Sequence, residues 1–117
     1  MTSCKKVLCC RDESDTYIAV GEGTTPIVYS YDTVYWNDAS CNGLFTKVNG
    51  IAYGNGTYVA VGAGSNTIAY SLDAVNWFGL GKSIFLSAGN SVAFSNNMWV
   101  GCGVGLNTIA YSIDGIV

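Results

Sequence analysis

The sequence of 117 residues contains no histidine, one proline and one arginine, and only 11% of its residues are charged. Without histidine, neither a Ser–His nor a Cys–His catalytic pair can form. Four lysines and Arg11, in a chain of net charge −3, do not form the basic surface that neutralises a run of phosphates. We therefore predict no catalytic residues, no cofactor and no nucleic-acid partner.

Long apolar runs are also missing. No run approaches the roughly 20 residues that cross a bilayer, and the stretch 7–10 behind Lys5 and Lys6 is too short for the core of a signal peptide. These features predict no membrane partner, no signal peptide and no transmembrane segment. The expected location is a reducing compartment such as the cytoplasm, or a virion.

The five cysteines are an odd number, and they do not recur as a repeated disulfide would. Without histidine or a C-x-x-C pair, no metal site is predicted. Cys10 and Cys102 take positions that hold aliphatic residues in other parts of a repeat described below. Because a free cysteine behaves as a small hydrophobe, we expect these thiols to be reduced and buried in the core.

What the chain does contain is a threefold repeat. The phrases YIAVGEGTTPIVYSYDTVYW, YVAVGAGSNTIAYSLDAVNW and WVGCGVGLNTIAYSIDGIV begin at Tyr17, Tyr58 and Trp99, a constant spacing of 41 residues. Units of about 40 residues with a strand-turn-strand texture indicate a radial or stacked β architecture. We expect one repeat domain over 1–117, with units at about 5–41, 46–82 and 87–117, the outer strand of the last being incomplete.

Each unit predicts short antiparallel strands, and no window has a sustained helical period, so the expected fold class is all-β. Asn55-Gly56 suits the two-residue turn of a hairpin. The strands expected in the middle unit are Val48–Tyr53, Thr57–Gly62, Thr67–Ser71 and Val75–Phe78. Those expected in the first unit are Val7–Arg11, Tyr17–Gly21, Ile27–Tyr31 and Val34–Trp36. Those expected in the third unit are Ser91–Phe94, Met98–Gly103 and Thr108–Ser112, with the fourth strand missing.

A second recurrent feature is the motif Tyr-Ser-x-Asp-x-x-x-Trp. A serine and an aspartate two residues apart can accept hydrogen bonds from the backbone N–H groups of a following turn, while the tryptophan covers the hairpin. Catalytic or calcium-binding aspartates are the alternative, which we do not favour because three separate units hold them well apart. The motif residues are Ser30, Asp32, Trp36, Ser71, Asp73, Trp77, Ser112 and Asp114.

This motif resembles the BNR or Asp-box-like repeats of the sialidase superfamily and related β-propellers. The resemblance implies four-stranded blades, with the motif on the turn between the third and fourth strands. The motif's glycine is present only as Gly115, with Thr33 and Ala74 at the equivalent positions, and the serine-to-tryptophan spacing is one residue shorter. The chain is more similar to diverged GTNTIAYSxDGxxW repeats in hypothetical proteins of large DNA viruses and phages. Sialidase activity is not implied, because those enzymes use three arginines and this chain has only Arg11.

Three blades do not close a ring, since single-chain propellers have four to eight. Apart from the turn aspartates, only Asp38, Lys47 and Lys82 carry charge after residue 22, and such a surface tends to be covered by a partner. We expect self-association, most simply two chains joined head to tail as a 3+3 ring, or a larger protein assembly. A single-chain β-trefoil, which also has threefold repetition, is the alternative.

These patterns favour a non-catalytic structural or protein-interaction module, for example a component of a virion or surface assembly. The alternative is a lectin-like carbohydrate-binding module, in which Tyr35 and Asn76 occupy equivalent turn positions and contact a glycan. A third hypothesis is a hydrolase completed by other domains or chains.

Overall fold

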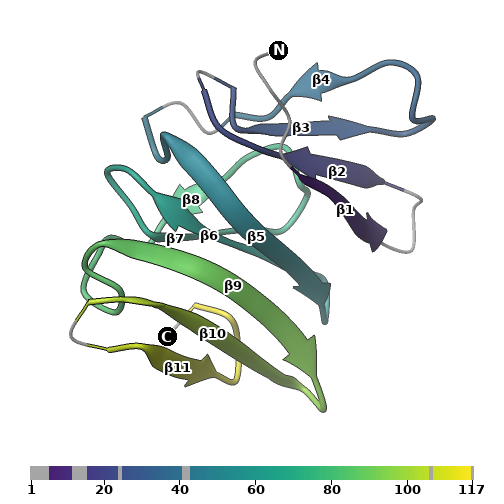
Figure 1. The fold of residues 1–117 in the computed structure, drawn as a ribbon. Helices are drawn as coiled ribbons and strands as arrows, with labels where there is room; N and C mark the ends of the chain where they lie inside the picture. The colour runs from purple at the N-terminus through teal and green to yellow at the C-terminus, as the bar shows by residue number, and fades with distance from the viewer. Residues whose placement is uncertain (1–5, 12–15, 24, 41–42, 106, 117) are drawn as a thin grey trace.

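The computed structural model describes residues 6–11, 16–23, 25–40, 43–105 and 107–116, and for 6–11 it describes the backbone alone. All regular structure in this part of the chain is β-strand, which confirms the all-β prediction (Figure 1). No helix able to cross a membrane is found among the described residues.

The strands form three antiparallel sheets, each built from consecutive strands. The first sheet has the order β1-β2-β3-β4, with strands Lys6–Arg11, Tyr17–Val20, Ile27–Ser30 and Asn37–Asp38. The second has the order β5-β6-β7-β8, with strands Lys47–Gly54, Thr57–Ala63, Ile68–Ser71 and Phe78–Gly79. The third has the order β9-β10-β11, with strands Ala88–Ser95, Met98–Val104 and Ile109–Ser112.

The fourth strands lie later in the chain than the sequence suggests. Strands were predicted at Val34–Trp36 and Val75–Phe78, but β4 and β8 begin at Asn37 and Phe78. The preceding residues lie in the turn that the Ser and Asp side chains organise. In the second sheet, the backbone of Val75 and Trp77 also pairs with Ser40, through hydrogen bonds of 2.6 and 3.2 Å, before β8 begins. The prediction of these two strands was therefore wrong in position.

The hairpin turns follow the expected chemistry. Asn55 and Gly56 have φ values of 49° and 76°, and β5 and β6 pair on either side of them. Asn96 and Asn97, with φ values of 51° and 59°, connect β9 to β10 in the same way. Positive φ at both central residues matches the right-handed twist of the flanking strands.

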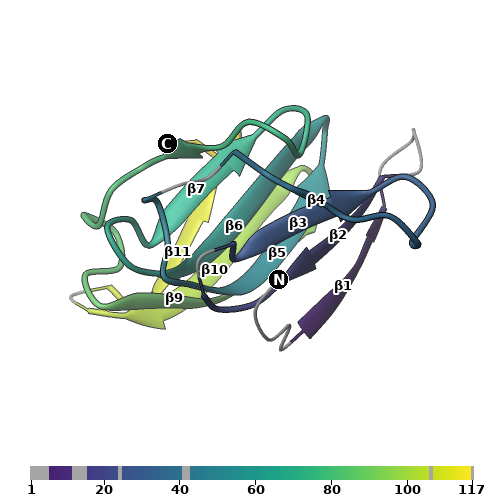
Figure 2. The ribbon, with the colours of Figure 1, turned by 90° about the horizontal axis from the view of Figure 1, so that it is seen from above.

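The three sheets lie side by side in chain order, so that the second sheet separates the first from the third (Figures 1 and 2). Strand β5 contacts β1 on one side and β9 on the other. Packing is close where β5 meets β9, because a Cβ added at Gly54 would lie 2.2 Å from the Phe94 ring. The described strands form separate sheets and not one barrel, so they give no support to the β-trefoil alternative.

The main hydrophobic core lies between the first and second sheets. Ile18 and Ile27 of the first sheet meet Tyr58 and Ala60 of the second, and all four side chains are fully buried. Trp77, which immediately precedes β8, belongs to the same cluster. Burial of this kind is the main favourable term in forming such a sheet pair.

Candidate interaction site

The motif of the second sheet forms a turn in which two side chains replace missing backbone partners. The Ser71 hydroxyl accepts hydrogen bonds from the N–H groups of Asp73 (3.2 Å) and Ala74 (2.9 Å), and donates one to Asp73 Oδ1 (3.0 Å). The same carboxylate oxygen accepts from the N–H groups of Val75 (2.9 Å) and Asn76 (2.8 Å). The turn is thus fixed by its own side chains, independently of any ligand.

The other two sheets contain the same turn. In the first sheet, Ser30 accepts from the N–H of Thr33 at 2.8 Å, and Asp32 accepts from those of Val34 and Tyr35, each at 2.9 Å. In the third sheet, Ser112 accepts from the Gly115 N–H at 2.9 Å and Asp114 from the Ile116 N–H at 2.8 Å. The three aspartates therefore have one structural role in three separate places.

The hydrogen bonds shift the acidity of two of these carboxyl groups. For Asp32, the backbone N–H of Tyr35 and then that of Val34 lower the pKa below its ordinary value. For Asp73, partial burial would raise the pKa, but the N–H groups of Asn76 and Val75 and the side chains of Asn76 and Ser71 lower it to about 2. Both shifts are accounted for by structural hydrogen bonds, which stabilise the charged carboxylate.

The third residue after each motif serine has a left-handed backbone. The φ values are 66° for Thr33, 69° for Ala74 and 80° for Gly115. Such values are uncommon for residues other than glycine. This position of the turn therefore favours glycine, although Thr33 and Ala74 adopt the same conformation in the first and second sheets.

The two motif tryptophans lie in different surroundings. The indole of Trp77 is 5% exposed and its ring centroid is 6.4 Å from that of Tyr58. The Trp36 indole donates its N–H to the Thr33 carbonyl oxygen of its own turn at 3.2 Å, but the residue is 37% exposed. Trp77 is thus buried against the hairpin, whereas Trp36 is only partly buried.

The two residues considered for glycan binding lie on separate turns. The Tyr35 side chain is 76% exposed. Asn76 is also exposed, but its amide donates a hydrogen bond to Asp73 Oδ2 at 3.0 Å. Tyr35 is thus the better placed of the two to contact a ligand.

A larger feature comes from the register of the second and third strand of each sheet. Paired residues Ile18 and Tyr29, Val59 and Tyr70, and Val100 and Tyr111 occupy equivalent positions on one face, which we call the forward face. Its complete membership is Ile18, Val20, Ile27 and Tyr29 in the first sheet, Val59, Val61, Ile68 and Tyr70 in the second, and Val100, Cys102, Ile109 and Tyr111 in the third. The opposite side is the rear face.

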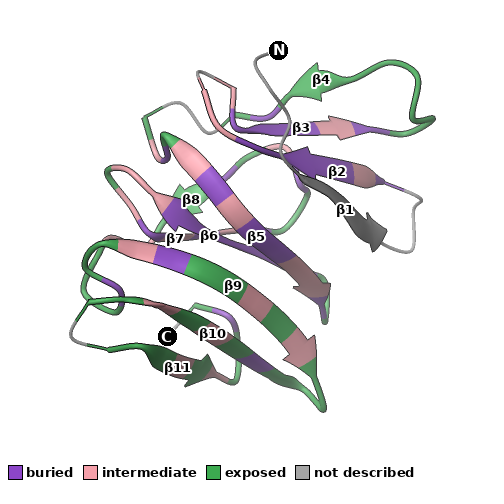
Figure 3. Ribbon diagram, viewed as in Figure 1, coloured by how far each residue is buried: buried purple, intermediate pink, exposed green. Residues whose placement is uncertain are grey.

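Each forward face packs on the rear face of the next sheet, except the last. Ile18 is 0% exposed and belongs to the core shared with the second sheet. Val59 is 4% exposed and lies close to Gly115, which follows β11. In the third sheet Val100, Ile109 and Tyr111 are 43%, 72% and 71% exposed. Figure 3 shows exposed segments along β10 and β11. The exposed forward face of the third sheet is therefore an apolar surface whose counterparts are core elsewhere in the same chain.

This exposure corrects one expectation. Cys102 was predicted to be a buried core thiol because it is equivalent to Val20 and Val61, which are each 1% exposed. Cys102 is instead free and exposed. The equivalence in position is right, but no sheet among the described residues covers the forward face of the third sheet. The side chains of Cys10 and the other three cysteines lie outside the described part.

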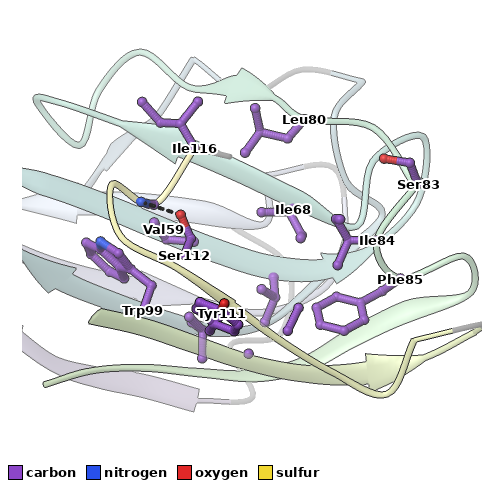
Figure 4. Close-up of a pocket in the computed structure, with 15 residues that line it drawn as sticks. Val59, Ile68, Leu80, Ser83, Ile84, Phe85, Trp99, Tyr111, Ser112 and Ile116 are labelled. Carbon is purple, nitrogen blue, oxygen red and sulfur yellow. Dashed lines mark hydrogen bonds between the residues drawn. The ribbon is translucent and has the colours of Figure 1, made fainter. Parts of the chain in front are cut away.

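A cavity of about 310 Å³ lies between the forward face of the second sheet and the rear face of the third. Val59 and Ile68 of the second sheet and Trp99 of the third line it (Figure 4). Ala110 and Ile116 are also among the lining residues. Most of the wall is apolar, with Ser83 and Ser112 as the polar exceptions.

No group of three or more potential metal ligands occurs among the described residues. Comparisons of the chain with protein-family models, with curated proteins and with solved structures find no match. The sequence pattern could have revealed the forward face, because its members recur at intervals of 41. The cavity has no such signal, since it depends on how two sheets pack.

Proposed function

We propose that the chain is a non-catalytic protein-interaction module whose three sheets are blades of a β-propeller. In this proposal two chains join head to tail in a 3+3 ring, and this ring is a component of a virion or surface assembly. One observation carries it: the exposed forward face of the third sheet repeats, position for position, faces that are buried within the chain. Apolar faces of this kind are normally covered.

The direction of packing supports a head-to-tail contact. Within the chain, forward faces always meet rear faces, so the natural partner of the third forward face is the rear face of a first sheet in another copy. A contact between different surfaces is heterologous, and it closes a ring when the rotation per unit permits. Two copies contribute six sheets, a number in the range of known propellers.

The rear face of the first sheet offers a matching but incomplete surface. Ala19 and Val28 are already buried in the single chain, with 5% and 3% exposure. Tyr17 is half-buried and Trp36 remains 37% exposed. By analogy with Trp77, which packs on the preceding sheet, we expect Tyr17 and Trp36 to provide most of the contact area.

The test is the molar mass in solution, measured by light scattering after size exclusion. We expect twice the chain mass, and we expect Val100→Asp combined with Ile109→Asp to give the single-chain mass, since two charges would be buried without partners. The matched control is Leu72→Asp, because Leu72 is 65% exposed on a turn outside this face. A native chain that remains monomeric at high concentration would contradict the proposal.

Carbohydrate binding is the second candidate, and the exposed ring of Tyr35 favours it. Asp32 accepts a hydrogen bond from the Tyr35 backbone N–H, so the backbone that carries the ring is fixed before any sugar arrives. A glycan array with the native chain and with Tyr35→Ala tests this function. Binding that is unchanged by the substitution, or no binding at all, would exclude a role for Tyr35.

A further inference from the structure

The first and second turns of the Ser–Asp motif differ in how the aspartate carboxylate is used. In the second turn both oxygens of Asp73 are hydrogen-bonded. Oδ1 accepts from the Ser71 hydroxyl and from the turn backbone, and Oδ2 accepts from the Asn76 amide at 3.0 Å. In the first turn Tyr35 takes the place of Asn76. The amide that caps the second carboxylate oxygen is therefore replaced by a phenol ring.

Asp32 Oδ2 is an open hydrogen-bond acceptor. Oδ1 of the same carboxylate accepts from the Ser30 hydroxyl at 3.0 Å and from the N–H groups of Val34 and Tyr35 at 2.9 Å each. No donor bonds Oδ2 among the described residues, and Asp32 is exposed. The N–H groups of Tyr35 and Val34 hold the Asp32 pKa below its ordinary value, so the open oxygen belongs to a carboxylate that is charged at neutral pH.

Exposed aromatic side chains share this turn with Asp32. Tyr31 is 61% exposed, Tyr35 is 76% exposed and Trp36 is 37% exposed. Tyr35 occupies the position from which Asn76 reaches the carboxylate of its own turn, so the Tyr35 side chain leaves the backbone close to Asp32. The turn connects β3 to β4 at the outer end of the first sheet, away from the other two sheets (Figures 1 and 2). A ligand can therefore reach ring and carboxylate together.

The charge of this part of the chain favours a cationic ligand. All charged residues between positions 16 and 40 are acidic, namely Glu22, Asp32 and Asp38. A cation gains twice at this turn, because a carboxylate oxygen accepts a charge-assisted hydrogen bond and the face of an aromatic ring attracts positive charge. A neutral ligand gains neither of these charge interactions.

We infer that the turn at residues 31–36 binds an alkylammonium group, carried by a lysine side chain of another molecule or by a free amine. The ammonium donates a hydrogen bond to Asp32 Oδ2, and its alkyl stem lies against the Tyr35 ring. An ammonium fits this turn better than a guanidinium does, because one carboxylate oxygen is open and bidentate pairing needs two. This site goes beyond the proposed self-association and does not depend on it.

The probe is N-acetyl-lysinamide, titrated into the isotope-labelled chain and followed by NMR. The backbone N–H groups of Val34 and Tyr35 are local reporters, because they bond the other oxygen of the same carboxylate. N-acetyl-norleucinamide, which has an alkyl side chain without charge, is the matched control. We expect the probe to shift both signals and the control to bind more weakly by about fivefold or more. Equal affinity for butylamine would identify a free amine as sufficient, and weaker butylamine binding would favour a lysine of a polypeptide.

Two reciprocal substitutions test the position that differs between the turns. Tyr35→Asn gives the first turn the residue of the second, so its amide should cap Asp32 Oδ2 and the probe should bind about fivefold more weakly. Asn76→Tyr makes the reverse change and should create a second site, detected at the Val75 N–H, which bonds Asp73 Oδ1. Tyr35→Phe keeps the ring and should keep the affinity. Circular dichroism establishes that each variant is folded.

Four results would each overturn the inference. They are equal binding of the probe and its neutral control, full binding by folded Tyr35→Asn, binding that added salt does not weaken, and a neutral sugar that shifts the reporter signals while the amine does not. The last result would assign this turn to carbohydrate binding. The variant Val100→Asp with Ile109→Asp should bind the probe as the native chain does, so a failure of the proposed self-association leaves this test unaffected.

Discussion

Trp77 donates its indole N–H to the carbonyl oxygen of Ala74, three residues earlier, at 3.0 Å. Trp36 repeats this bond to Thr33 at 3.2 Å. The local geometry is the same in both turns, but only the first of these rings is covered by a neighbouring sheet. The contribution of each tryptophan to stability is therefore set by packing between sheets and not by the turn motif.

This difference predicts unequal effects of the same substitution. Trp77→Ala should lower the free energy of unfolding by about 3–5 kcal/mol, as expected for loss of a buried aromatic side chain. Trp36→Ala should cost about 1–2 kcal/mol, because its ring is already 37% exposed. Urea denaturation measures both values in the single-chain variant Val100→Asp with Ile109→Asp, because association of native chains would cover Trp36. Equal losses in this variant would show that the hydrogen bond within the turn dominates.

A gain in stability is expected at the first turn. Thr33 is a β-branched residue at φ 66°, a conformation that costs about 1–2 kcal/mol for residues other than glycine. Thr33→Gly removes this strain, offset in part by the greater freedom of glycine in the unfolded chain. We expect a net stabilisation of about 0.5–1 kcal/mol in thermal unfolding.

Gly115→Ala provides the opposite change at the equivalent position. Its new Cβ would lie 3.0 Å from Val59 Cγ2 and 3.1 Å from the Trp99 indole, with φ still at 80°. This substitution should destabilise the chain. If Thr33→Gly instead lowers the melting temperature, the hydroxyl contact of Thr33 with the Asp32 carbonyl outweighs the backbone strain.

The turn carboxylates predict a dependence of stability on pH. The Asp73 pKa is about 2 in the folded chain against 3.8 ordinarily. A group whose pKa is lowered by folding contributes stability that is complete above the unfolded value and is lost as pH falls through the folded value. The window is therefore pH 4 to pH 2. Because Asp73 is exposed, we expect about 1 kcal/mol or less after solvent screening.

Asp73→Asn tests this assignment. The variant should lose part of the stability difference between pH 5 and pH 2, and Asp38→Asn serves as the charge-matched control because Asp38 lies in β4 outside the turn. Guanidinium unfolding at several pH values measures the change. An identical pH profile of unfolding for the native chain and Asp73→Asn would show that Asp73 is not the source of the pH dependence of stability.

The sequence predicts the local parts of this fold better than the long-range ones. The all-β class follows from strand alternation, and the turn at Asn55-Gly56 follows from residues that tolerate positive φ. The positions of β4 and β8 do not follow, because hydrogen bonds to Asp32 and Asp73 extend each turn into residues with strand-forming side chains.

The sequence also does not predict which residues of the third sheet are exposed. Cys102 matches two buried valines by position, yet its exposure depends on whether another sheet is present. Equivalent residues share conformation because conformation is local. They share burial only if their neighbours are repeated as well. Burial inferred from the repeat alone is therefore wrong for Cys102 on the third sheet.

The same thiol reports on the proposed assembly. Cys102 lies on the exposed forward face of the third sheet beside Ile109, with which it pairs across the strands. If two chains join through this face, the thiol becomes inaccessible in the assembled form. We expect alkylation by a maleimide to slow at least tenfold as the chain concentration is raised through the association range, with modification at Cys102 followed by peptide mass spectrometry.

The variant Val100→Asp with Ile109→Asp is the control for this measurement, since it should remain a single chain. Its Cys102 should react at a rate that does not depend on chain concentration, while Leu72→Asp should behave like the native chain. A native rate that stays constant over the range in which light scattering detects association would show that chains associate through another surface. The exposed forward face would then need a different partner, because 72% exposure of Ile109 is too large for an apolar core position.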